Sequence, residues 1–447
     1  MKYTQQPFDI FSKLQTHYKN AYILESIEGP KKLAQYSFIG FSPSTTIQIK
    51  NGQATINNKT TGKKTKQKTT DPLNLIKETL KHKTIHNHKY RFIGGAVGYI
   101  SFNTVQYWEK IVNTKKDDTG FPDIEMGIYD DGFIFDHTKQ EAFYYFQKEN
   151  RLSEVKKILK KPINTESLKI SEPKNNISKE QFKKAVKTAK KYITTGDIFQ
   201  VVLSKRYQFQ IKGTLTPFYQ TLRRINPSPF MYYYKAGDRQ IVGSSPEMLV
   251  RVDNRVIETF PIAGTTQATQ DEEENILLAR ELLSDPKEQA EHVMLVDLAR
   301  NDIGKISKFG TVTVPEFMNI QRYSHVQHIV SQVVGKLQDH LESFDALRAV
   351  FPAGTVSGAP KIRAMEIINE LEPTQRGPYA GAVGYFSYNG NADFAITIRT
   401  LFAHKQKAYM QAGAGIVADS IPEHEWVETE NKLEALITAL KTSEENR

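Results

Sequence analysis

The 447-residue chain contains no cysteine. Disulfides, thiolate zinc sites and a cysteine nucleophile are therefore excluded within it. The sequence also lacks an uninterrupted apolar run of about 20 residues, the length that spans a bilayer, and its first residues contain no apolar signal core. From these absences we expect a cytoplasmic protein with no membrane partner.

Basic residues outnumber acidic ones, which gives a formal net charge of +10. Part of it comes from lysine-rich stretches such as residues 58–68. Such an excess suits nucleic acid, an acidic partner or a small anionic substrate. The chain has no basic stripe interleaved with aromatic residues and no recognisable nucleic-acid-binding motif. We therefore expect no nucleic-acid partner.

The order of apolar and turn-forming residues predicts an α+β fold. Residues 1–150 have the pattern of short strands and turns with a few helices. Residues 151–177 are rich in Lys, Glu, Asn, Ser and Pro and are expected to be a linker to a second domain, residues 178–440. Ser178 and Gln181 form a capping box that starts a helix there. Strands and helices alternate without a regular βαβ rhythm, which favours large antiparallel sheets.

Two predicted helices carry the acidic residues of most interest. An acidic cap and a proline start one helix at 285–286, and it carries Glu291. The last helix starts near Pro422 and places Glu425, Glu428 and Lys432 on one face. Such carboxylates suit a divalent cation. A surface glutamate and an ordinary i, i+4 salt bridge are the alternatives, and these segments alone leave them open.

Two glycine-containing segments, 352–361 and 412–415, are expected to be turns whose backbone N–H groups approach an anion. Neither has the surroundings or spacing of a nucleotide-binding loop. Arg399 lies in a strand-like run, where a guanidinium needs an anionic partner. His328 is either a core histidine or a proton carrier, and its spacing alone favours the core.

Longer motifs then identify a family. They are residues 196–204, 226–231, 243–247, 261–265, 290–298, 354–361 and 413–419. In these segments the chain resembles the chorismate-utilising enzymes, and most closely the large subunit (component I) of anthranilate synthase. The resemblance implies a large α+β sandwich of antiparallel sheets flanked by helices. Residues 1–150 would be the N-terminal domain, carrying part of a regulatory site, and residues 178–440 the chorismate-binding catalytic domain.

The resemblance also implies the ligands of the site. Glu291 and Glu428 match magnesium ligands, and hard carboxylate oxygens suit Mg²⁺. Gly415 and Lys432 would contact the ring carboxylate of chorismate, while Tyr379 and Arg399 would hold its enolpyruvyl carboxylate. The other residues implied to contact substrate are Gly413, Ala263, Gly264 and Thr265.

Five positions determine the chemistry that the resemblance implies. Glu247 matches the general acid that protonates the departing ring hydroxyl. Gln200 stands where water-using isochorismate and salicylate synthases carry a lysine base. Ala263 stands where 4-amino-4-deoxychorismate synthases carry a lysine that attacks the substrate. His328 and Thr355 match residues around the ring. Direct attack by ammonia is therefore expected, giving anthranilate and pyruvate in the first step of tryptophan biosynthesis; the two other synthase reactions are the alternatives.

A partner and a regulator are implied as well. Ammonia release from glutamine ordinarily needs a thiol, so a separate glutamine amidotransferase subunit is expected, often in a heterotetramer. Feedback inhibition by tryptophan is also expected, because residues 24–26 and 226–231 match the family's tryptophan pocket. Its matched residues are Glu25, Ser26, Pro229, Phe230 and Met231.

Overall fold

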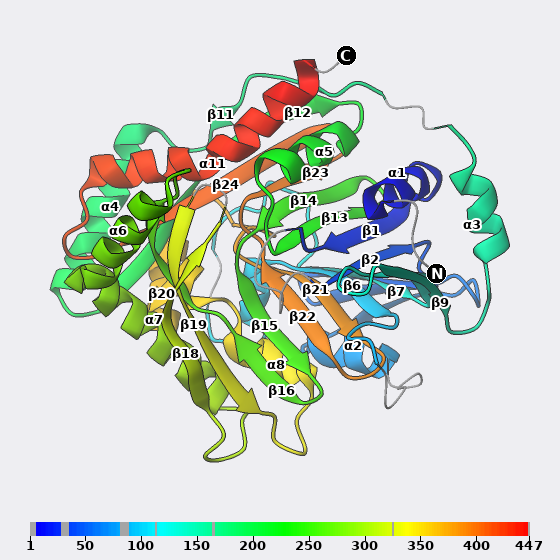
Figure 1. The fold of residues 1–447 in the computed structure, drawn as a ribbon, viewed down its shortest axis with the longest axis horizontal. Coiled ribbons are helices and arrows are strands. Elements are labelled where there is room, and N and C mark those ends of the chain that lie inside the picture. The colour runs from blue at the N-terminus through cyan, green and yellow to red at the C-terminus, as the bar shows by residue number, and fades with distance from the viewer. Residues whose placement is uncertain are drawn as a thin grey trace.

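The computed structural model describes residues 6–27, 35–80, 89–111, 114–162, 166–323 and 326–445. In these ranges the strands form two antiparallel sheets of twelve strands each, and helices flank them (Figure 1). The predicted α+β class with large antiparallel sheets is confirmed. None of the described helices is long and apolar enough to cross a membrane.

The first sheet has the order β10-β12-β24-β23-β14-β13-β1-β2-β8-β9, and β11 and β20 also pair with β12. Its strands are β1 (Asn20–Glu25), β2 (Tyr36–Phe41), β8 (Asp131–Asp136), β9 (Glu141–Phe146), β10 (Lys169–Ile170), β11 (Lys174–Asn175), β12 (Gln200–Lys212), β13 (Phe230–Ala236), β14 (Arg239–Ser245), β20 (Gly358–Ala359), β23 (Thr400–His404) and β24 (Lys407–Ile416).

The second sheet has the order β17-β19-β16-β15-β22-β21-β6-β7-β3-β4-β5, and β18 also pairs with β19. Its strands are β3 (Thr45–Lys50), β4 (Gln53–Asn58), β5 (Lys64–Lys68), β6 (Gly95–Ile100), β7 (Ile124–Tyr129), β15 (Met248–Asp253), β16 (Val256–Thr259), β17 (Ile262–Gln267), β18 (Thr313–Arg322), β19 (Val326–Lys336), β21 (Ala382–Ser387) and β22 (Ala392–Ile396).

The helices begin where the sequence provides caps. Ser178 and Gln181 form the predicted capping box, and the Asp285 carboxylate accepts from two backbone N–H groups. The helices are α1 (Pro7–His17), α2 (Pro72–Leu80), the 3₁₀ helix η2 (Phe102–Tyr107), α3 (Leu152–Leu159), α4 (Lys179–Thr194), α5 (Thr216–Ile225), α6 (Glu272–Ser284), α7 (Pro286–Gly304), α8 (Ser343–Val350), α9 (Gly354–Ser357), α10 (Lys361–Leu371) and α11 (Pro422–Glu445).

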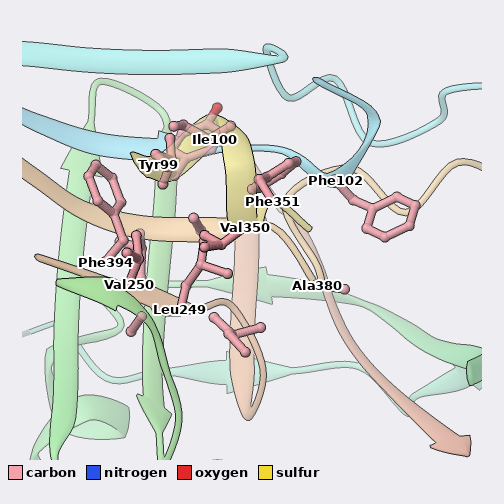
Figure 2. Close-up of a cluster of buried hydrophobic side chains, with 14 of the residues drawn as sticks. Tyr99, Ile100, Phe102, Leu249, Val250, Val350, Phe351, Ala380 and Phe394 are labelled. Atoms are coloured by element: carbon pink, nitrogen blue, oxygen red, sulfur yellow. The ribbon is translucent and has the colours of Figure 1, made fainter. Parts of the chain in front are cut away.

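The first 150 residues and the catalytic segment contribute strands to both sheets. Strand β1 pairs with β13, and β6 pairs with β21. The buried side chains mix in the same way: Figure 2 shows Tyr99 and Ile100 of β6 beside Leu249 of β15 and Phe394 of β22. Residues 151–177 contain α3 and the short strands β10 and β11. The two segments therefore pack into the same two large hydrophobic clusters, and the boundaries at 150 and 178 stay predictions.

Two of the places where the chain crosses from one sheet to the other are adjacent. Strand β14 of the first sheet leads through Glu247 into β15 of the second, and β22 of the second leads through Arg399 into β23 of the first. The two crossings are tied together, because the Ile396 N–H donates to the Glu247 carbonyl (3.1 Å) and the Ser244 N–H donates to the Arg399 carbonyl (3.1 Å).

Candidate active site

Glu247 lies at the first crossing with its carboxyl group buried. Thr355 Oγ1, on α9, donates a hydrogen bond to Glu247 Oε1 (2.8 Å). Burial raises the pKa of Glu247 to about 7, although the Thr355 bond and the positive charge of Lys432 both lower it. A carboxyl group with this pKa is protonated in an appreciable fraction of molecules near neutral pH, which is the state a general acid needs.

Gln200, the first residue of β12, lies beside the acidic face of α7. Its amide Nε2 donates to Glu291 Oε1 (3.1 Å), while its Oε1 is buried and has no hydrogen-bond partner among the described residues. Gly415 pairs across the ladder with Val202, and a Cβ there would lie 2.7 Å from Gln200 Nε2, so a larger residue would displace the Gln200 amide. This end of β12 is thus shaped around the Gln200 amide.

Lys432 of α11 reaches back to the strand that carries the glycines. Its Nζ donates to the Glu428 carboxylate (2.5 Å) and to the Gly413 carbonyl (2.9 Å). A Cβ on Gly413 would lie 3.0 Å from the Tyr379 hydroxyl oxygen, so the tyrosine also faces this strand. Gly413 and Gly415 lie within β24, which corrects the expectation of a turn: glycine is required here for close packing against strand and side chains.

Arg399 is a half-buried cation that forms no ion pair among the described residues. It lies between β22 and β23 with φ of 51°, so the expected strand-like run is interrupted at this residue. Its Nη1 donates to the Lys432 carbonyl (2.8 Å), and within the described ranges no carboxylate forms an ion pair with it. Partial burial of a guanidinium without a carboxylate is costly, and a strained backbone commonly marks a functional site. An anionic ligand would compensate Arg399.

His328 lies on β19 opposite the end of β17. Its Nδ1 is 3.0 Å from the Gly264 carbonyl oxygen and 3.0 Å from Thr265 Oγ1. A carbonyl only accepts, so Nδ1 carries the proton and Nε2 keeps its lone pair. Burial lowers the pKa of His328, and the charge of Arg399 lowers it further. The imidazole is therefore neutral near pH 7 and can accept a proton at Nε2. Ala263 precedes the bulge in β17 at Gly264, where φ is 67°.

Four glutamates on α7 and α11 create a negative cluster. Burial and the charges of Glu291, Asp285 and Glu428 raise the pKa of Glu288, while Lys287 lowers it. Burial and the charge of Glu428 also raise the pKa of Glu425. Hard oxygen donors that repel one another fit a divalent cation. In the described ranges no three acidic or histidine side chains converge enough to hold a metal ion. Glu291 and Glu428 are the two residues predicted to contribute carboxylates to one.

Comparison with known proteins defines the family. The sequence model described as chorismate binding enzyme matches residues 19–438. The chain belongs to this family. The anthranilate synthase component 1 of Methanothermobacter marburgensis is 48% identical over 441 residues, which cover 99% of this chain and 94% of that protein. The anthranilate synthase component 1 of Saccharolobus solfataricus is 44% identical over 434 residues, 97% of each chain.

A solved structure of the same kind of protein as these two relatives also matches the chain. The crystal structure of anthranilate synthase component I from Streptococcus pneumoniae matches with a TM-score of 0.80 and 39% identity, covering 92% of this chain and 93% of that one. The resemblance to the large subunit of anthranilate synthase is therefore confirmed as a similarity of sequence and fold.

This member of the chorismate binding enzyme family has a cavity between its sheets that is lined by none of the candidate catalytic residues, and we call it the second cavity. The cavity has a volume of about 500 Å³ including its open mouth, and Glu25, Ser26, Phe230 and Met231 line it. Ser26 Oγ donates to the Pro229 carbonyl (2.6 Å), so all five residues predicted for the tryptophan site lie at one place. The Glu25 carboxylate is already held by Arg223 (2.7 Å) and Tyr219 (2.7 Å).

Sequence reasoning missed one polar group of this second cavity. Asp393 of β22 lines it, and its Oδ1 is buried without a hydrogen-bond partner in the part of the chain that the structure describes. Arg251 donates to the other oxygen, Oδ2 (2.8 Å). Nothing in the sequence around Asp393 signals this role, because its place depends on the pairing of β22 with β15 and β21.

Proposed function

We propose that this chain is a magnesium-dependent lyase that converts chorismate and ammonia to anthranilate, pyruvate and water. The observation that carries the proposal is that the candidate site contains both a buried acid, Glu247, and an amide, Gln200. An acid is available for the leaving hydroxyl, and the Gln200 position has no basic side chain to activate water. Relatives named anthranilate synthase component 1 support the same reaction.

Substrate binding follows from the charges. Bound Mg²⁺ would neutralise the ring carboxylate of chorismate and the facing glutamates, Glu291 and Glu428. Lys432, with its Nζ at the Gly413 carbonyl, is placed to meet the same ring carboxylate beside Gly415. Arg399 would pair with the enolpyruvyl carboxylate, and the Tyr379 hydroxyl would donate to it.

In the first step the chain supplies a proton and a position. Glu247 gives its proton to the ring hydroxyl, which leaves as water, and Thr355 holds the resulting carboxylate through its hydrogen bond. Ammonia forms the new C–N bond at the ring carbon next to the carboxylate-bearing carbon. Neutral ammonia is nucleophilic enough to attack without a base, and the ammonium group that it forms then releases one proton to solvent. Water is a weaker nucleophile and would require a base. Ala263 has no nucleophilic side chain, so the attack is direct.

In the second step the ring becomes aromatic. Nε2 of the neutral His328 removes the ring proton at the carbon that carries the new amine. The electron pair of the broken C–H bond completes the aromatic ring as the ring C–O bond to the enolpyruvyl group breaks. The departing group takes up one proton at its methylene carbon, which balances the proton removed by His328, and leaves as pyruvate. The hydrogen bond from Nδ1 to the Gly264 carbonyl holds the imidazole in the tautomer that this transfer needs.

The source of ammonia and the control of the enzyme complete the proposal. The chain has no cysteine, so glutamine-derived ammonia would come from a separate glutamine amidotransferase subunit, in a heterotetramer. Tryptophan would inhibit from the second cavity, where Asp393 Oδ1 is available to accept from its ammonium group.

The test is product identification. The purified chain is incubated with chorismate, Mg²⁺ and ammonium, and anthranilate fluorescence and pyruvate are measured together. We expect equal amounts of both. Glutamine should replace ammonium only when an amidotransferase subunit is added. Formation of 4-amino-4-deoxychorismate would overturn the interpretation of Ala263, and isochorismate would overturn that of Gln200.

A further inference from the structure

Arg376 is a buried cation behind the site and has no part in the proposed chemistry. It lies between α10 and β21, and its residue exposure is 1%. Its Nε and Nη2 donate to the two carboxylate oxygens of Glu372 (3.0 and 2.7 Å), which is itself buried. The pair is a fork of two parallel bonds, the geometry that fixes a guanidinium most tightly.

The ion pair binds the backbone of β12 where neither β20 nor β11 pairs with that edge. One edge of β12 pairs with β20 at residues 200–201 and with β11 at residues 207–208. Between these points Arg376 Nη2 donates to the Val202 carbonyl (2.6 Å), and Glu372 Oε1 accepts from the Ser204 N–H (2.8 Å). The two side chains thus satisfy backbone groups that would otherwise be buried without partners.

The same guanidinium reaches three segments of the candidate site. Nη1 donates to the carbonyl of Val356 (2.7 Å), the residue after Thr355. Val202 follows Gln200 by two residues on β12. The guanidinium carbon also lies 5.6 Å from the centre of the Tyr379 ring. One planar group therefore connects the segment that holds the Glu247 partner, the strand that starts at Gln200 and a tyrosine that faces substrate.

We propose that Arg376 is a positioning residue, which holds Thr355 and Gln200 at a fixed separation across the substrate. The inference rests on the proposed function. It predicts that removing hydrogen bonds of Arg376 changes the position of Thr355 and its partner Glu247 relative to Gln200. Displacements of about 1 Å from a change outside the reacting groups can lower turnover about 100-fold.

Arg376→Lys is the informative substitution. Lysine keeps the charge next to Glu372 but cannot also reach Val202 and Val356, since it lacks the planar fork. We expect kcat to fall about 100-fold in the presence of saturating chorismate, Mg²⁺ and ammonium. When α9 is less constrained, the Thr355 bond that lowers the pKa of Glu247 weakens. The alkaline limb of kcat/KM should therefore move to higher pH, by up to about one unit. Lys432, the other group that lowers this pKa, is unchanged.

Arg239→Lys is the matched control. Arg239 of β14 also forms a fork, with Glu125 (2.7 and 2.6 Å), and its side chain is only 18% exposed. It contacts none of the site segments. We expect Arg239→Lys to lower the thermal unfolding midpoint, as Arg376→Lys does, while its kcat and alkaline limb stay within twofold and a few tenths of a pH unit of the wild type.

The possible outcomes distinguish a failure of the proposed function from a failure of the positioning role. A wild-type chain that forms no anthranilate overturns the proposed function. A wild type that is active, with an Arg376→Lys variant that loses stability but keeps kcat and the alkaline limb, overturns the positioning role. If Arg376→Lys is recovered unfolded, Glu372→Gln takes its place. The amide still accepts from Ser204 but holds Arg376 less firmly, and the same fall in kcat and the same pH shift are expected.

Discussion

The substitution Glu247→Gln tests the buried acid through stability as well as activity. Burial raises the pKa of Glu247 from its ordinary value of 4.5 to about 7. The folded protein therefore binds this proton more tightly than the unfolded chain does. That contribution to stability is fully present below about pH 4.5 and is lost as the pH rises through 7. At 1.36 kcal/mol per pKa unit, the full difference is about 3.4 kcal/mol.

Glutamine carries no titrating proton and keeps the oxygen that accepts from Thr355. Between pH 5 and pH 8 the wild type should therefore lose about 2.5 kcal/mol of stability that the variant does not lose. An unfolding entropy of about 2.1 cal/mol/K per residue corresponds to about 0.9 kcal/mol per degree for a chain of this length. When the pH is raised from 5 to 8, the thermal unfolding midpoint of the variant should therefore rise by about 3 °C relative to that of the wild type.

Calorimetry at pH 5 and pH 8 measures this difference, and turnover is measured in parallel. Glu434→Gln, on the exposed side of α11, is the control. Its unfolding midpoint should differ from that of the wild type by the same amount at both pH values. We expect Glu247→Gln to have no measurable turnover. A midpoint difference that does not depend on pH would show that Glu247 has no raised pKa, and its assignment as the general acid would fall.

Three further predictions concern single residues. Thr355→Val removes the hydrogen bond that lowers the pKa of Glu247, so the alkaline limb of kcat/KM should move up by about one pH unit; a shift to lower pH would contradict the bond's role. Glu428→Ala should abolish turnover with little change in the unfolding midpoint, and near-normal activity at any Mg²⁺ concentration would refute the ligand assignment. Ser26→Phe should fill part of the second cavity and raise the tryptophan concentration needed for half-inhibition at least about tenfold without lowering kcat; unchanged inhibition would place the regulatory site elsewhere.

The helices that carry the acids could be predicted from local sequence. Helix α4 begins directly after Ser178, α7 begins at Pro286 after its aspartate cap, and α11 begins at Pro422. Caps and proline act within a few residues, so their effect can be read without the rest of the fold. The site residues came from the resemblance of short segments to the chorismate-utilising enzymes.

The arrangement of strands could not be read in this way. Strand β6 pairs with β21, almost 300 residues further along the chain, and such pairings depend on the whole sheet. For the same reason Gly413 and Gly415 were expected in a turn: glycine favours turns locally, but here each glycine makes room for a side chain from a distant segment. Arg376 gave no signal, since its partners Val202 and Val356 are brought to it only by the fold.

The central claim is that a divalent cation held between α7 and α11 anchors the ring carboxylate of the substrate. Crystals grown with Mn²⁺ in place of Mg²⁺ and soaked with chorismate would test it by anomalous diffraction. The account predicts one strong peak between the carboxylates of Glu291 and Glu428, with the substrate carboxylate as a further ligand. A peak elsewhere, or a bound substrate with no metal at its ring carboxylate, would contradict it.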